Sequence, residues 1–227
     1  MVKFHIIGID GAHGGGKTTT LRYIESLGYI VFYDNYIKYS TKINDEMPKC
    51  IKIGCLQGFF TQRRWIDDWA MKIWSIMRKY EDEHKNEKKI VYIFTDRTPL
   101  SAYVYYQSSL LAVDPANLKQ TLRKRQQEHN NLNELYESYK RIFMIFKNND
   151  IKITMILLSC SYELNKTRII ERAKKDNIHL QYNEESDICL KFVRHEYEVV
   201  LQSEFDSFIN TNDKTVEKLS TIIFNHI

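Results

Sequence analysis

Glycines gather near the start of the chain more than anywhere else along it. Five of the eight glycines in this 227-residue sequence fall between residues 8 and 16, where it reads GIDGAHGGGKT. Glycine costs backbone entropy in a helix or strand and is tolerated where the backbone turns sharply or approaches a ligand. The segment from Gly11 to Thr18 matches G-x-x-x-x-G-K-[ST], the pattern of a phosphate-binding loop. An apolar run precedes it and an amphipathic segment follows it, which is the strand–loop–helix context that the pattern requires.

The residue types of this loop suit a nucleoside triphosphate. Loop glycines let backbone N–H groups surround phosphate oxygens, and the N-terminus of the following helix adds positive partial charge. Lys17 is expected to reach the β- and γ-phosphates, and the Thr18 hydroxyl is expected to ligate Mg²⁺. The predicted nucleotide-binding residues are Gly11, Gly14, Gly15, Gly16, Lys17, Thr18 and Thr19. We therefore expect ATP and Mg²⁺ as cofactors.

Short apolar runs alternate with helical segments along the whole chain. The runs cover residues 2–9, 29–33, 90–95, 151–158 and 205–209. Alternation of this kind is typical of a parallel sheet with helices on both faces. Hydrophobic spacing and caps predict helices over 17–27, 59–80 and 215–225, and one bent helix or two helices between 115 and 148. We expect one α/β domain over residues 1–227, with a doubly wound, five-stranded parallel sheet in a three-layer arrangement.

Composition excludes several classes of protein. Hydrophobic residues make up 43% and charged residues 27% of the chain, as in a globular domain. The net charge of +4 favours an anionic ligand and is too small to indicate a nucleic-acid partner. The four cysteines form no CxxC pair, and the histidines lack metal-binding spacing. Because the sequence shows neither a signal peptide nor an apolar run that could cross a membrane, we expect a cytoplasmic protein with reduced thiols.

A second polar motif, Asp96-Arg97-Thr98, follows the apolar run at 90–95. Ligands bind at the carboxyl ends of the strands in sheets of this type, so the motif is expected beside the glycine loop. Asp96 would hold Mg²⁺ through water. Arg97 would neutralise an acceptor phosphate or the charge that develops on the transferred group. The alternative is a surface pair, Asp96 with Arg97, that caps the next helix.

The two motifs together resemble those of the thymidylate kinase and deoxynucleoside kinase superfamily of P-loop kinases. The loop of that superfamily reads GxxGxGK[ST], which this chain matches at Gly11, Gly14, Gly16, Lys17 and Thr18. Its second motif reads [DE]R[YST] and is followed by a serine, which this chain matches at Asp96, Arg97, Thr98 and Ser101. The resemblance implies a P-loop kinase fold and ATP-dependent phosphoryl transfer to a nucleoside or a nucleoside monophosphate.

Less specific similarities extend the resemblance along most of the chain. The segment from Tyr105 to Gln107 looks like the AYQ-like segment of thymidylate kinases, which makes Tyr105 a candidate for substrate binding. Arg168 and Arg172 follow the fourth apolar run and are four residues apart, so both lie on one helix face. The resemblance implies a lid over about 165–186, whose two arginines close over the transferring phosphoryl group; a solvated helix face is the alternative. The resemblance also allows a homodimer that forms through the long helices.

The acceptor substrate stays open between two chemical classes. A nucleoside offers a 5′-hydroxyl group, which benefits from a carboxylate base, and Asp34 is the candidate. A nucleoside monophosphate is already anionic and needs arginines instead, for which Arg63 and Arg97 are candidates. Gln62 is a candidate for a hydrogen bond to a pyrimidine base, although aromatic stripes at helical spacing more often belong to a core. Asp34 lacks the proline that follows this acid in deoxynucleoside kinases, and His13 stands where thymidylate kinases often have Asp.

The leading hypothesis is therefore a thymidylate kinase-like enzyme that phosphorylates a nucleoside monophosphate. A deoxynucleoside kinase is the first alternative. An ATPase or polynucleotide kinase that acts on a macromolecule, and a non-catalytic nucleotide-binding protein, are the others. A regulatory GTPase is disfavoured because no Asp in the chain is followed by Gly three residues later. Motor and AAA-type ATPases are disfavoured because Asp96 is followed by Arg97 rather than by a second acid.

Overall fold

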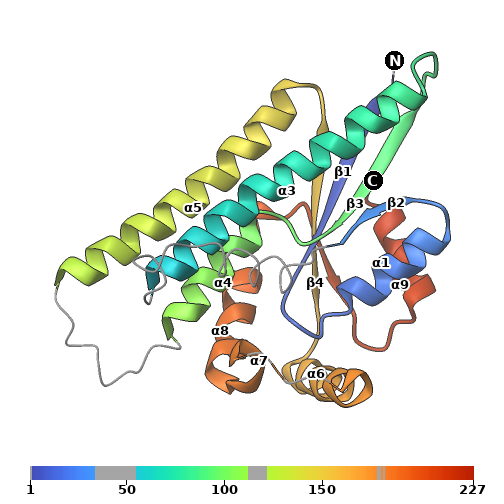
Figure 1. Cartoon of the computed structure of the whole chain (residues 1–227). Coiled ribbons are helices and arrows are strands. Elements are labelled where there is room, and N and C mark those ends of the chain that lie inside the picture. Colours follow the sequence, from blue (N-terminus) through green and yellow to red (C-terminus); the bar gives the residue numbers. More distant parts are fainter. Residues whose placement is uncertain (1, 34–54, 112–121, 178–179, 181) are drawn as a thin grey trace.

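The centre of the protein is a five-stranded sheet in which every strand runs parallel to its neighbours (Figure 1). The computed structural model describes residues 2–33, 55–111, 122–177, 180 and 182–227. The strand order is β2-β3-β1-β4-β5. The strands are β1 (Lys3–Asp10), β2 (Ile30–Phe32), β3 (Ile90–Asp96), β4 (Lys152–Ser159) and β5 (Ser207–Asn210). The predicted parallel sheet is confirmed, with strand ends that shift by at most two residues.

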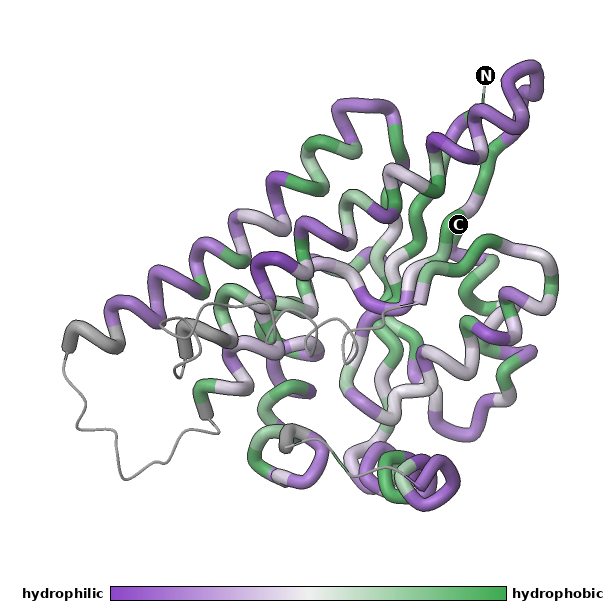
Figure 2. The backbone as a smooth tube through the Cα atoms, in the orientation of Figure 1, coloured by the Kyte–Doolittle hydropathy of each residue, from purple (hydrophilic) through white to green (hydrophobic). Residues whose placement is uncertain are grey.

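The three central strands are buried on both faces, which explains their apolar sequences. β1 lies between β3 and β4, where Ile6 pairs with Ile93 on one side and with Ile153 on the other. Ile6, Ile7 and Ile9 are fully buried, although consecutive side chains of a strand point to opposite faces. Strands covered on both sides have near-continuous apolar runs instead of an alternating pattern. Figure 2 shows these runs along the centre of the sheet.

Helices cover the two faces and complete a three-layer arrangement (Figure 1). On one face lie α3 (Cys55–Glu83), α4 (Leu100–Leu111) and α5 (Leu122–Asn148), with α8 (Asp187–His195) packed on α4. On the other face lie α1 (Lys17–Ser26) and α9 (Val216–Phe224). α6 (Tyr162–Asp176) and α7 (Tyr182–Glu185) follow the carboxyl end of β4, and the short η2 (Glu196–Val200) and η3 (Gln202–Glu204) lead into β5. The predicted doubly wound α/β fold is confirmed.

The aromatic stripe of the long helix α3 belongs to the hydrophobic core. The buried residues of this stripe are Phe59, Trp65, Ile66, Trp69, Ile73 and Met77. The predicted helix over 59–80 is confirmed and extends from Cys55 to Glu83. Of the predicted helical stretch between 115 and 148, the described part forms one helix, α5, whose apolar and polar residues alternate in Figure 2. None of the described helices is long and apolar enough to cross a membrane.

We expect the folded protein to lose stability in acid because of His5, a buried titratable residue of β1. Its Nε2 atom lies 2.8 Å from the Thr154 hydroxyl on β4, and the residue is 3% exposed. Burial, helped by the positive charge of Lys152, lowers the pKa of His5 from 6.5 to about 4. The unfolded chain therefore binds a proton as the pH falls through about 6.5, whereas the folded chain does not until about pH 4. The free energy of unfolding should fall over this window, by up to about 2 kcal/mol between pH 7.5 and 5 from this one group.

Urea denaturation at the two pH values measures this decrease. In the variant His5→Gln the side chain can still hydrogen-bond Thr154 but does not titrate. We expect the decrease in unfolding free energy to be smaller in His5→Gln than in the wild-type protein. Equal decreases in the two proteins would show that His5 is not the source.

Candidate active site

The glycine loop turns sharply between β1 and α1 and lies in close contact with β4 and α6. Gly11 has a φ of +136°, and a Cβ atom there would lie 2.2 Å from the carbonyl oxygen of Leu158 on β4. Gly14 has a φ of +73°, and a Cβ atom there would lie 2.6 Å from the carbonyl oxygen of Asn165 on α6. L-amino acids with side chains rarely adopt such φ values. The sequence therefore needs glycine at both positions to bring the loop between β4 and α6.

Lys17 is the buried cation of the loop. Its Nζ atom donates hydrogen bonds to the carbonyl oxygens of Gly11, at 2.7 Å, and Ala12, at 2.8 Å. Burial, and then the positive charge of Arg97, lower the pKa of Lys17 to about 7. A phosphate bound in the loop would place negative charge beside this ammonium group and so favour its protonated form. Lys17 thus lies where it can exchange two carbonyl partners for phosphate oxygens.

Thr18 and Asp96 meet although they are far apart in the sequence. The Thr18 hydroxyl, at the start of α1, donates a hydrogen bond of 2.7 Å to Oδ2 of Asp96, at the end of β3. Asp96 is only 6% exposed, which does not fit the alternative of a surface pair with Arg97. Among the described residues, no group of three or more His, Cys, Asp or Glu side chains could hold a metal ion. A hydroxyl and a carboxylate side by side still fit Mg²⁺, which takes its other ligands from phosphates and water.

Arg97 is held at the turn that ends β3. Its backbone has a φ of +77°, its N–H donates to Ile9 O at 3.0 Å, and its carbonyl accepts from the Trp69 indole at 3.2 Å. Its guanidinium group lies over the ring of Tyr105 on α4, with Cζ 4.4 Å from the ring centroid. The same ring contacts the imidazole of His13 edge-on, at 5.1 Å between centroids. The structure thus brings Arg97 and Tyr105 to the glycine loop.

Asp10 is a site residue that the sequence analysis did not single out. It ends β1 and is fully buried. It accepts hydrogen bonds from the hydroxyl groups of Thr98 at 2.5 Å, Ser101, and Tyr197 at 3.4 Å. Burial raises the pKa of Asp10, and the hydrogen bonds from Ser101 and Thr98 oppose this. Asp10 therefore connects the glycine loop, the start of α4 and η2.

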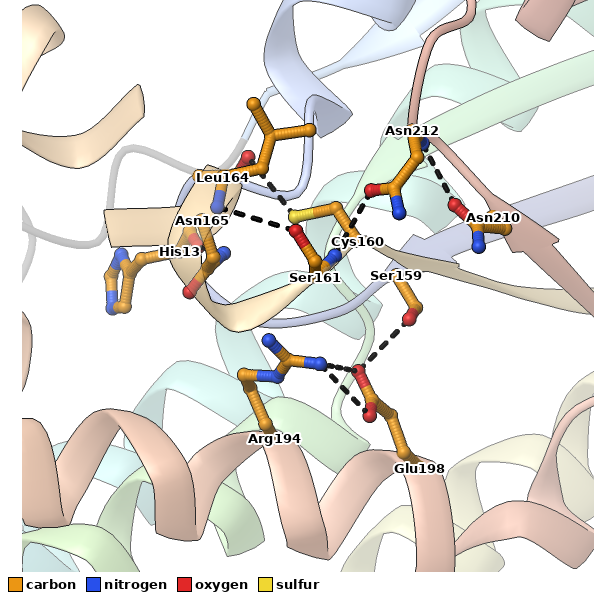
Figure 3. Close-up of polar contacts among 11 residues, drawn as sticks. His13, Ser159, Cys160, Ser161, Leu164, Asn165, Arg194, Glu198, Asn210 and Asn212 are labelled. Atoms are coloured by element: carbon orange, nitrogen blue, oxygen red, sulfur yellow. Dashed lines mark hydrogen bonds and ion pairs between the residues drawn. The ribbon is translucent and has the colours of Figure 1, made fainter. Parts of the chain in front are cut away.

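The first two turns of the helix α6 contact the glycine loop. Ser161 caps its N-terminus and accepts a hydrogen bond from Leu164 N. The Asn165 amide donates to the carbonyl oxygen of His13, in the region that Figure 3 shows. Arg168 donates to the carbonyl oxygen of Gly14 at 3.4 Å, and to the hydroxyl and carbonyl oxygens of Thr211 at 3.0 Å and 3.2 Å. These contacts do not fit a fully solvated α6 face.

Polar contacts behind the loop connect the ends of β4 and β5 (Figure 3). Asn212 accepts a hydrogen bond from the backbone N–H of Ser161 at 3.0 Å, and the Ser159 hydroxyl donates to Glu198 at 2.9 Å. Glu198 also pairs with Arg194 at 3.3 Å. These bonds fix the segment from which α6 starts, and so the position of its arginines.

Solved structures of two kinases share the fold of this chain over nearly its whole length. A deoxyadenosine kinase from M. mycoides with bound dCTP is 19% identical, with 97% of each chain covered and a TM-score of 0.56. A deoxyadenosine kinase from M. mycoides with dCMP and dCDP is 20% identical over the same shares, with a TM-score of 0.51. A thymidylate kinase from Candida albicans is 14% identical, with 98% of this chain and 90% of that chain covered and a TM-score of 0.58. The chain has the fold of the P-loop nucleoside and nucleotide kinases.

This likeness confirms, at the level of the fold, the resemblance drawn from the two sequence motifs. No model of a protein family matches the chain, and no curated protein matches its sequence. The link to the P-loop kinases therefore rests on the shared fold and on the geometry around the glycine loop.

Two substrate-binding candidates on α3 have different surroundings from Arg97. Arg63 pairs with Asp67 on its own helix at 2.5 Å and with Glu134 of α5 at 3.7 Å. Gln62 is 6% exposed. The structure thus joins Arg63 to α5, whereas it places Arg97 and Tyr105 against the loop. Asp34 lies outside the described residues.

Proposed function

We propose that the chain is an ATP-dependent kinase that phosphorylates a nucleoside monophosphate, in the manner of a thymidylate kinase. The observation that carries the proposal is the hydrogen bond between Thr18 and Asp96 beside the buried Lys17. This contact joins the start of α1 to the end of β3, which is where a phosphate-loop kinase needs its magnesium ligands. The fold shared with a deoxyadenosine kinase that has bound dCTP and with a thymidylate kinase supports the same proposal.

Phosphoryl transfer depends on positioning and electrostatic stabilisation more than on covalent chemistry. In the proposed reaction, Lys17 and the loop N–H groups hold the β- and γ-phosphates of ATP. Arg97 neutralises negative charge on the phosphate of the acceptor. Arg168 and Arg172 approach the transferring phosphoryl group from α6. Bound Mg²⁺ would neutralise phosphate charge from its place at Thr18 and Asp96. A water-excluding contact between α6 and the loop would favour transfer over hydrolysis.

A deoxynucleoside kinase is the second candidate function. The observation that favours it is the engagement of Arg63 with Asp67 and Glu134, because a phosphate acceptor needs free arginines. In this second reaction Asp34 would take the proton of a 5′-hydroxyl group as general base. Reduced thiols are in line with a cytoplasmic site of action, since Cys160 and Cys189 are buried and unpaired.

A transfer assay with ATP and Mg²⁺ against nucleosides and nucleoside monophosphates tests the proposal. We expect turnover on monophosphates, with thymidine monophosphate in the panel. Turnover on nucleosides alone would replace the first candidate by the second. In that case Asp34→Asn should lower the rate by about 10²-fold or more. If neither class of acceptor is phosphorylated while ATP still binds, both candidates fail, and a macromolecular acceptor or a non-catalytic role becomes the better hypothesis.

Arg97→Ala should raise the acceptor KM about 10-fold and lower kcat about 10- to 10²-fold, because it removes a cation beside the acceptor. Steady-state kinetics with varied acceptor measures both constants. Arg141→Ala is a matched control, since Arg141 lies on α5 and donates to Ser138. Acceptor constants in Arg97→Ala that match those of the control would support a purely structural role for Arg97.

A further inference from the structure

One buried carboxylate connects the glycine loop to the helix α6. Oε1 of Glu184, on α7, lies 2.8 Å from Nδ1 of His13 in the loop. The same oxygen accepts a hydrogen bond from the guanidinium group of Arg172 on α6. The side chain of Glu184 is 2% exposed and that of His13 is 9% exposed, whereas the side chain of Arg172 is 40% exposed. We call this arrangement the His13–Glu184–Arg172 bridge.

The charges in the bridge favour a fixed geometry. Burial lowers the pKa of His13 to about 4, so its imidazole is neutral at physiological pH and can donate one N–H to Glu184. Arg172 supplies the positive charge that a buried carboxylate needs. Removing the charge of Glu184 would leave Arg172 without its counter-charge and the loop without a link to that arginine.

Arg172 also keeps a donor that the bridge does not use. Its Nε atom is buried and has no hydrogen-bond partner among the described residues. A buried N–H of this kind is costly unless a ligand or water pairs with it. Since Arg172 lies one helical turn after Arg168, which contacts the loop at Gly14, a phosphate oxygen is a suitable partner for it.

We propose that Glu184 is a positioning residue, whose carboxylate holds α6 and the guanidinium group of Arg172 beside the loop for the transferring phosphoryl group. This inference rests on the proposed function. Glu184 itself touches no reacting atom in this account and acts through Arg172 and His13. Its loss should therefore affect transfer more than the binding of ATP, which depends on the loop and Lys17.

The test compares Glu184→Gln with the wild-type protein and with Asp187→Asn. Asp187 pairs with Lys166 of α6 at 2.8 Å, but the pair is exposed and does not touch the loop, so it is a matched control. In Glu184→Gln we expect kcat to fall about 10- to 10²-fold, with the KM for ATP changed by less than about threefold. Amide hydrogen exchange over 162–176 in the ATP-bound protein should become about 10-fold faster. Asp187→Asn should leave kcat and exchange close to the wild-type values.

Equal kcat and equal exchange in Glu184→Gln and Asp187→Asn would overturn the inference and leave the proposed function intact. Should the wild-type protein phosphorylate no acceptor, the proposed function fails by itself, and the exchange measurement still decides whether the bridge holds α6. If Glu184→Gln does not fold, His13→Ala takes its place, because it removes the loop side of the bridge and keeps the Glu184–Arg172 contact. Faster exchange over α6 in His13→Ala supports the bridge, and unchanged exchange overturns it.

Discussion

Replacing Lys17 by alanine should lower kcat for phosphoryl transfer by about 10³-fold or more, because the variant loses its buried ammonium group beside the developing charge. Among the described residues, Lys17 is the lysine whose ammonium group hydrogen-bonds the loop carbonyl oxygens of Gly11 and Ala12. In a water-poor site a fixed cation is worth far more than the same charge at the surface. Single-turnover measurements with the acceptor found in the panel would give the loss directly.

The same substitution should not unfold the protein. The pKa of Lys17 is lowered to about 7 chiefly by burial, which means that the folded state disfavours its charged form. Removing the ammonium group should therefore leave the urea midpoint unchanged or raise it. Lys218→Ala, on the exposed face of α9, is the matched control for both measurements. Transfer at the wild-type rate in Lys17→Ala would remove the proposed mechanism, whatever the acceptor.

Local patterns predicted the sheet and the loop because each depends on residues that are close in the sequence. A strand buried on both faces needs an unbroken apolar run, and a phosphate-binding loop needs glycines and Lys17 at fixed spacing. The meeting of Asp96 with the loop also followed, since parallel strands bring their carboxyl ends to one edge of the sheet. These parts of the fold and of the candidate site were predictable for that reason.

The remaining contacts join residues that no local pattern relates. Asp10 and its partner Tyr197 are 187 positions apart, so Asp10 looked in the sequence like the polar end of a strand. Glu184 lies on a helix of four residues, too short for a periodic signal. The aromatic spacing of α3 predicted which face is apolar but not what covers it. The structure shows that Phe59 and Trp65 face the core.

Replacing Trp69 by alanine should lower the free energy of unfolding by about 3–5 kcal/mol, the range for a large buried aromatic side chain. Trp69 is 1% exposed and packs against Phe143 and Phe146 of α5, at 6.4 Å and 6.0 Å between ring centroids. Alanine would leave a cavity between α3 and α5. It would also deprive the carbonyl oxygen of Arg97 of its indole donor. Urea denaturation of the variant measures the loss, which is a large share of the roughly 5–15 kcal/mol that holds most domains folded.

Trp69→Phe separates the packing of this residue from its effect on the site. The variant keeps a large ring but loses the N–H that holds Arg97 at its left-handed turn, so we expect a smaller loss of stability, about 1–2 kcal/mol. Because Arg97 is then less firmly positioned, the acceptor KM should rise severalfold while the KM for ATP stays unchanged. Trp74→Phe is the matched control. Trp74 lies on α3, as Trp69 does, and its ring stacks on Phe146 of α5 with 5.1 Å between the ring centroids. If both variants change the acceptor KM equally, the hydrogen bond from Trp69 does not position Arg97, and the aromatic packing of α3 alone accounts for the effect.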